Sequence, residues 1–141
     1  MNANVTTDFE GAARLTDWGV IRAAGAEAAS FLQSQLTQDV LGLDAQRATL
    51  AGWCSAKGRL LASFVVWRPA PDDVLLACSA DVLPATLKRL SMFVLRAKCR
   101  LADASPALAL YGLTGTAATA WLGACAPALP GQRSNGAGGQ V

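Results

Sequence analysis

Ser63, Val65 and Trp67 occupy alternate positions of an apolar segment, and they are the first candidates for a binding surface. Alternate side chains of a β-strand point to the same face, so we expect these three to lie side by side. An indole offers a flat surface on which a heterocycle can stack, and a nearby hydroxyl can hydrogen-bond to that ligand. The same face could instead form a second core layer or a domain interface, and the residues alone leave both interpretations open.

The residue types for acid–base or metal chemistry are sparse. The chain contains no histidine, which excludes Ser-His and Cys-His pairs and removes the commonest general base and metal ligand. Its aspartates fall in predicted loops or at helix starts, and no two of them form an evident acid–base pair. The four cysteines lack the spacing of a CxxC motif or a zinc site: Cys54, Cys78, Cys99 and Cys125. We therefore predict no catalytic residue and no metal site.

The composition is that of a globular protein with a large core. The 141 residues are 52% hydrophobic and 16% charged, with a net charge of +2, which is too small to indicate a nucleic-acid or membrane partner. The N-terminal residues do not resemble a secretion signal, and no apolar run approaches the roughly 20 residues that span a bilayer. We therefore expect a cytoplasmic protein with reduced thiols, no membrane association and no direct nucleic-acid binding.

Basic residues are nevertheless concentrated in one segment. Five of the twelve fall between positions 88 and 100: Lys88, Arg89, Arg96, Lys98 and Arg100. They form either a solvated helix face and strand end or an electropositive wall for a polyanion.

Hydrophobic periodicity predicts the elements that must position these residues. Strands are expected over 18–23, 47–54, 59–68, 74–78, 98–102 and 107–111, and helices over 26–36, from 79 or 81 to 94, and over 116–122. Residues 55–58 predict a hairpin turn. This order favours an α+β fold in which helices pack on a mainly antiparallel sheet.

The strand predicted over 59–68 is apolar on both faces. Leu60, Ala62, Phe64 and Val66 should share one face, and Leu61, Ser63, Val65 and Trp67 the other. Such a strand must be covered twice, by the helices on one side and by another domain or a ligand on the other. The predicted domain spans residues 16–126, between an arm over 1–15 and a Gly/Pro-rich linker or truncated end over 127–141.

Three separate blocks resemble a known family. They are TDWGVIRAAGAEAASFLQSQLTQDV at 16–40, WCSAKGRLLASFVVWR at 53–68 and LKRLSMFVLRAKCRL at 87–101. In this order they resemble the N-terminal part of the YgfZ-type folate-binding proteins, which are relatives of the glycine-cleavage T-protein, an aminomethyltransferase. The resemblance covers about residues 15–111, roughly the first half of the family pattern, so a C-terminal domain would be missing.

The resemblance implies a tetrahydrofolate-binding protein that supports iron–sulfur cluster assembly or repair and thereby tRNA modification, with iron–sulfur enzymes as clients. It places Trp18 against the folate, and Trp67 and Ser63 in the same cavity. T-proteins carry an acidic pair where this chain has Ala62 and Ser63, and this difference argues against aminomethyl transfer. A folate-dependent aminomethyltransferase is one alternative, and a non-catalytic fragment that acts as an interaction module is another. The family's cysteine motif KGCYxGQE is absent from this chain.

Overall fold

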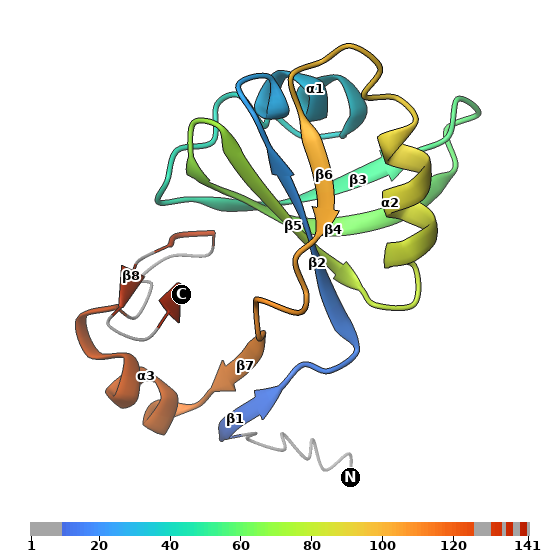
Figure 1. Cartoon of the computed structure of the whole chain (residues 1–141). Helices are drawn as coiled ribbons and strands as arrows, with labels where there is room; N and C mark the ends of the chain where they lie inside the picture. Colours follow the sequence, from blue (N-terminus) through green and yellow to red (C-terminus); the bar gives the residue numbers. More distant parts are fainter. Residues whose placement is uncertain (1–9, 126–130, 134, 137–138, 141) are drawn as a thin grey trace, which may run out of the picture.

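A five-stranded antiparallel sheet forms the centre of the molecule in the computed structural model, which describes residues 10–125, 131–133, 135–136 and 139–140 (Figure 1). The strand order is β3-β4-β5-β2-β6. The strands are β2 (Trp18–Ala24), β3 (Ala48–Cys54), β4 (Leu60–Ala70), β5 (Asp73–Ser79) and β6 (Arg100–Asp103). The hairpins β3–β4 and β4–β5 place strands that are consecutive in sequence side by side.

Two helices cover one face of this sheet. Helix α1 (Ala28–Gln35) and helix α2 (Leu83–Ser91) bury apolar side chains against it, among them Leu32 and Leu90. From the sheet, Phe64 and Val66 of β4 enter the same core, each at most 1% exposed. The α+β prediction, with helices packed on a mainly antiparallel sheet, is confirmed.

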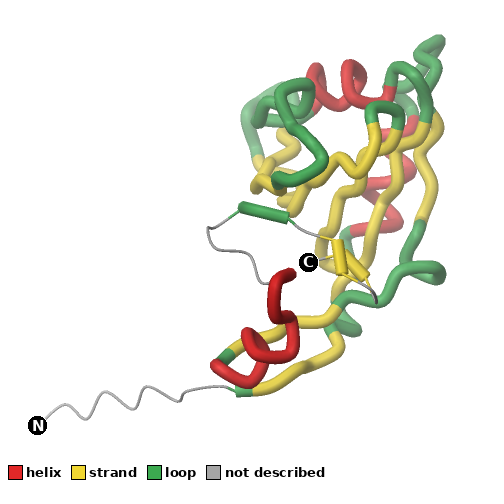
Figure 2. Tube along the Cα trace, turned by 90° about the vertical axis from the view of Figure 1, so that its left-hand side faces the viewer, coloured by secondary structure: helices red, strands yellow, loops and turns green. Residues whose placement is uncertain are grey.

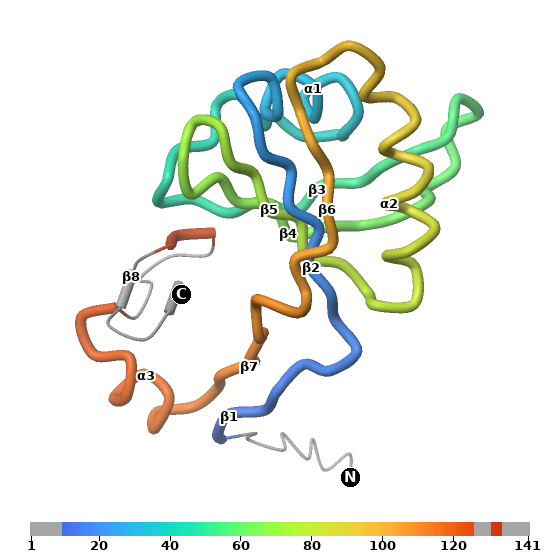
Figure 3. Tube along the Cα trace, viewed as in Figure 1, coloured from blue at the N-terminus to red at the C-terminus, as the bar shows by residue number. Residues whose placement is uncertain are grey.

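A smaller unit lies beneath the main sheet. Strands β1 (Gly11–Arg14) and β7 (Tyr111–Thr114) pair antiparallel, and helix α3 (Thr116–Leu122) follows β7 (Figures 2 and 3). Glu10 joins the two ends of this unit, because its Oε1 accepts hydrogen bonds from the Thr116 backbone N–H at 3.1 Å and hydroxyl at 2.8 Å. Short elements complete the described chain: η1 (Gly123–Cys125), β8 (Asn135–Gly136) and β9 (Gly139–Gln140).

The start of β4 departs from strict alternation. Cys54 pairs with Leu60 whereas Trp53 pairs with Ala62, so Leu61 is an extra residue in the ladder. Such a bulge shifts the side chains on its near side to the opposite faces. Leu61 consequently packs against the main core, and Leu60 is 63% exposed. The predicted faces hold from Ala62 onward and are wrong for these two leucines.

Two predicted elements differ from their expected bounds by three residues or more. Helix α2 ends at Ser91 rather than residue 94, because the chain continues in i→i+3 turns until Leu95 takes a φ of +47°. The strand expected over 107–111 forms as β7 instead, after a turn in which the Ala107 N–H donates to the Ala104 carbonyl.

Both predicted terminal segments contain paired residues. Residues 11–14 of the expected arm form β1, because β7 offers them an antiparallel partner, while residues 1–9 lie outside the described part. Residues 131–133, within the expected linker, pack along the start of β3: the Ala48 N–H donates to Gly131 O and the Arg133 N–H to Gln46 O, each at 2.6 Å. Arg133 is buried there. The periodicity of the sequence did not predict either contact.

Candidate functional site

An open hollow of about 360 Å³ lies on the sheet face that carries Ser63 and Val65. Its walls come from the start of β2, from β3 and β4 and from Thr37, two residues after α1, and they include Trp18, Gly52, Leu60 and Ser63. We call it the sheet hollow. Helices α1 and α2 pack on the other face of the sheet, so neither helix covers this hollow.

Trp18 and Ser63 are brought together at the sheet hollow although 45 positions separate them. Trp18 begins β2, where it pairs with Ser79 of β5, and its side chain is 39% exposed. Ser63 is exposed on β4. An accessible indole and a hydroxyl that line one hollow suit a flat, polar heterocycle.

Thr37 is a member of the hollow that the sequence analysis missed. Its backbone N–H donates to the Gly52 carbonyl at 2.9 Å, and its Oγ1 accepts from the Gly52 N–H at 2.8 Å. Because that oxygen is the acceptor, the threonine hydroxyl proton remains able to donate to a ligand. In the sequence, Thr37 follows the helix expected over 26–36, and a threonine in that position indicates only the end of a helix, not a binding site.

The absence of a side chain at Gly52 leaves space for the hollow. A Cβ atom at this position would lie 2.9 Å from Leu60 Cδ1 and 3.3 Å from Thr37 Oγ1. A side chain there would therefore push its neighbours apart and occupy space beside them. The glycine leaves backbone rather than side chain facing the hollow.

Trp67 lies elsewhere on this face of the sheet. It pairs with Ala48 and Leu75 and packs against a small second core that contains Val20 and Ala77. It is four residues from Ser63, roughly 13 Å along an extended strand, and it is not among the residues that line the hollow. The structure thus gathers Trp18 and Ser63, whereas Trp67 supports the neighbouring apolar layer.

The hollow has an apolar rim and suits a ligand of moderate size. Leu50 and Leu60 beside it are 75% and 63% exposed. Its volume falls within the roughly 300–1,000 Å³ typical of small-molecule sites. A pterin needs stacking surface and a few hydrogen-bonding groups, and Trp18, Ser63 and Thr37 supply both. The residues present therefore fit the pterin of a folate.

Known structures first establish the fold. The chain superimposes on the glycine cleavage system aminomethyltransferase T from Bartonella henselae with a TM-score of 0.69. The match covers 88% of this chain and 34% of that protein at 21% sequence identity, so it shows the T-protein fold and nothing of activity. No protein-family model matches the chain.

Comparison with curated proteins then tests the predicted family resemblance. The tRNA-modifying protein YgfZ of Edwardsiella ictaluri is 35% identical over 117 residues, which are 83% of this chain and 35% of that protein. YgfZ of Sodalis glossinidius is 31% identical over 82% of this chain and 35% of its own length. The predicted resemblance to YgfZ-type proteins is confirmed. An uncharacterized protein of Haemophilus influenzae is also similar, at 32% identity over 60% of this chain.

The chain spans about a third of the length of these YgfZ relatives, less than the half that we expected.

The described residues contain no group of three or more Asp, Glu, Cys or His side chains placed to hold a metal ion. Among the same residues, no helix has both the length and the hydrophobicity needed to cross a bilayer.

Proposed function

We propose that this chain supplies part of a tetrahydrofolate-binding site, with the pterin held in the sheet hollow. Trp18 stacks on or flanks the ring, and the hydroxyl of Ser63 hydrogen-bonds to its polar edge. The observation that carries the proposal is the convergence of an accessible indole, a hydroxyl and an apolar rim on one hollow of about 360 Å³. Trp67 contributes through the layer beside the hollow, where it packs near Val20.

Binding rather than chemical transfer is the proposed activity. The T-protein resemblance implies an acidic pair where this chain has Ala62 and Ser63, and a methyl group and a hydroxyl cannot act as carboxylates. Ala62 is moreover buried in the main core. The likeness to the Bartonella aminomethyltransferase concerns fold alone.

The name of the relatives suggests the cellular role. The curated relatives are called tRNA-modifying proteins. We infer that a protein containing this chain acts in the cytoplasm and supports assembly or repair of iron–sulfur clusters in client enzymes, and through them tRNA modification. The remaining part of such a protein would cover the exposed apolar rim around Leu50 and Leu60.

Calorimetric titration of the chain with tetrahydrofolate tests the proposal. We expect saturable binding that Trp18→Ala weakens by about tenfold or more, because stacking on one aromatic ring is worth roughly 1–3 kcal/mol. Ser63→Ala should weaken binding less, by the loss of one hydrogen bond.

Trp121→Ala is the matched control. Trp121 lies on α3 and is 76% exposed, away from the residues that line the sheet hollow. Its replacement removes an accessible indole without touching the site. Equal affinity of Trp18→Ala and Trp121→Ala for tetrahydrofolate would refute the assignment of Trp18.

A further inference from the structure

A second hollow, of about 260 Å³, lies between the C-terminal end of α2 and the β3–β4 hairpin. Its walls include Gln35, Trp53, Leu61, Arg89 and Phe93. We call it the hairpin pocket. Trp53 and Leu61 belong to the face of the sheet that packs against the helices, so this pocket is separate from the sheet hollow.

The walls of the hairpin pocket are preformed and largely apolar. Phe93 meets the Trp53 ring edge-on, with the ring centroids 6.4 Å apart, and the Arg89 guanidinium carbon lies 6.0 Å from the Trp53 ring centroid. Trp53 is 4% exposed, whereas Phe93 is 48% exposed. The indole therefore holds its two neighbours in place, and Phe93 and Arg89 are left for contact with a partner.

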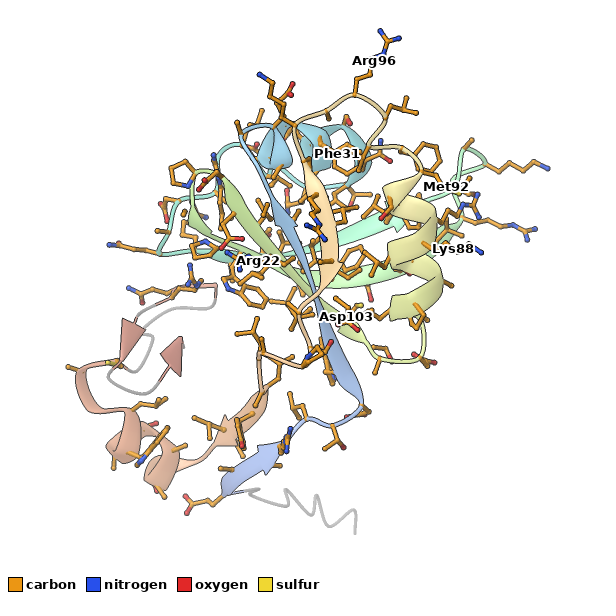
Figure 4. All side chains as sticks on the ribbon, in the orientation of Figure 1. Arg22, Phe31, Lys88, Met92, Arg96 and Asp103 are labelled. Atoms are coloured by element: carbon orange, nitrogen blue, oxygen red, sulfur yellow. The ribbon has the colours of Figure 1, made fainter. Side chains whose placement is uncertain are left out.

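Basic side chains adjoin the residues that line the pocket. Arg89 is in the wall and Lys88 precedes it on α2, while Lys57 and Arg59 follow the lining residues Ser55 and Ala56 on the hairpin; all four basic residues are exposed. No Asp or Glu occurs in residues 45–71 or 82–102, so these two segments bring no opposite charge. Figure 4 shows Lys88 on the outward side of α2 and Met92 at its C-terminal end, with Arg96 projecting from the loop beyond it. Met92 is 68% exposed and adds apolar surface.

Size and geometry decide between kinds of partner. The pocket is smaller than the sheet hollow, about 260 against about 360 Å³, and this size suits one or two side chains of a partner better than a whole folate. Binding of single-stranded nucleic acid relies on several accessible aromatic rings, but Trp53 is buried and only Phe93 is accessible among the pocket's aromatic residues. An apolar pocket with an arginine in its wall is typical of an anchor site between proteins.

We propose that the hairpin pocket docks an acidic segment of a partner protein, with one apolar side chain inserted between Phe93 and Arg89. Carboxylates on either side of that anchor pair with Lys57, Arg59 and Lys88. These basic side chains steer the partner toward the site and select acidic sequences, and the anchor supplies most of the affinity.

Fluorescence anisotropy with defined peptides tests this proposal on the 141-residue chain. The probe is a labelled peptide with one phenylalanine between two pairs of glutamates. Two companions replace the phenylalanine with alanine or all glutamates with glutamine, and a labelled ten-residue oligouridylate represents nucleic acid. We expect the acidic phenylalanine peptide to bind about tenfold more tightly than either companion. Its affinity should fall as the salt concentration rises from about 50 to 300 mM.

Variants connect the binding to the pocket. Arg89→Gln and the double variant Lys57→Gln/Lys88→Gln should each weaken the acidic peptide about tenfold or more. The double variant alters no residue of the pocket wall, so it keeps the test valid if Arg89→Gln, which removes a side chain packed over Trp53, does not fold. Arg14→Gln, on β1 in the smaller unit, is the matched control and should bind as the unaltered chain does.

Four results would overturn the proposal: no binding of the acidic phenylalanine peptide, equal affinity for its glutamine companion, tighter binding of the oligouridylate, or an equal loss in Arg14→Gln. Tetrahydrofolate should not displace the peptide, because the two hollows lie on opposite faces of the sheet. Displacement by direct competition would likewise contradict the proposed location. These results do not depend on whether the sheet hollow binds folate.

Discussion

Gly52 and Trp53 are neighbours in β3, yet they line different hollows on opposite faces of the sheet. The alternation of side chains along a strand produces this arrangement. Gly52 leaves room in the sheet hollow beside Thr37, and Trp53 fills the core and supports the hairpin pocket. One short segment thus contributes to both hollows, and a substitution at Gly52 or at Trp53 can alter one hollow without altering the other.

Gly52→Ala should reduce ligand binding without unfolding the chain. The new methyl group would lie 2.9 Å from Leu60 Cδ1, but Leu60 is 63% exposed and can move. We expect the free energy of unfolding to change by less than about 1 kcal/mol. Affinity for tetrahydrofolate should fall, because the methyl group and the displaced leucine occupy the hollow.

Thermal unfolding and calorimetry of Gly52→Ala measure these two quantities. Gly112→Ala, in β7 of the smaller unit, is the matched control: a Cβ atom there would lie 3.4 Å from Leu15 Cδ2, an ordinary contact, and Gly112 does not line the sheet hollow. An unchanged affinity in Gly52→Ala would show that the ligand does not approach this wall.

Leu95→Gly should stabilise the chain. Leu95 has a φ of +47° and is 86% exposed, so it has an unfavourable backbone conformation with little packing in return. Glycine accepts this conformation freely, and the relief exceeds its extra entropy in the unfolded state. We expect a gain of about 0.5–1 kcal/mol in denaturant unfolding. Met92→Gly, at a residue with a φ of −65°, should instead lose stability.

Stability should decline in alkaline solution in a way that depends on Cys78. Burial among apolar residues raises the pKa of the Cys78 thiol to about 11, and the nearby carboxylates of Asp103 and Asp81 add to this effect. The unfolded chain therefore loses this proton first as the pH rises, and the free energy of unfolding falls between roughly pH 9 and pH 11. The contribution is on the order of 2 kcal/mol.

Cys78→Ala should remove that part of the pH dependence, although it will lower stability at neutral pH by leaving space in the core. Urea unfolding at several pH values between about 7 and 11 measures the slope. Cys54→Ala, at a half-buried position on β3, is the comparison. The same alkaline slope in Cys78→Ala and in the unaltered chain would contradict the role of the buried thiol.

Arg133→Ala should release the segment at residues 131–133 from the edge of β3. The Arg133 guanidinium donates to the Ala45 carbonyl at 2.6 Å, and burial lowers the pKa of this arginine. Loss of the side chain should cost about 1 kcal/mol and expose the Ala48 N–H, which donates to Gly131 O. Hydrogen exchange at Ala48 should become faster, whereas Lys57→Ala at the hairpin turn should leave it unchanged. Equal protection of the Ala48 N–H from exchange in Arg133→Ala and Lys57→Ala would refute the role of Arg133 in holding residues 131–133 against β3.

Local sequence patterns predicted most of the main domain. The turn at 55–58 lies between two strands, as expected, and Phe64 and Val66 are buried on the face predicted for them. The resemblance drawn from three blocks agreed with the curated relatives and with the T-protein fold. The strands and their buried faces depend on side-chain periodicity within a few residues, which a linear sequence displays directly. The resemblance depends on residue identities in the three blocks, which the sequence also displays.

Only the tertiary structure decided which residues share a site. Trp18 and Ser63 meet at one hollow because β2 and β4 flank β5, whereas Trp67, on the expected face of β4, packs in the neighbouring apolar layer. The bulge at Leu61, the pairing of Thr37 with Gly52 and the burial of Arg133 follow equally from contacts between distant segments. The sequence alone determined which segments become the strands of the main sheet and, from Ala62 onward in β4, which face enters the core. The register and order of those strands, which are set by packing across the whole sheet, determined where the hollows lie.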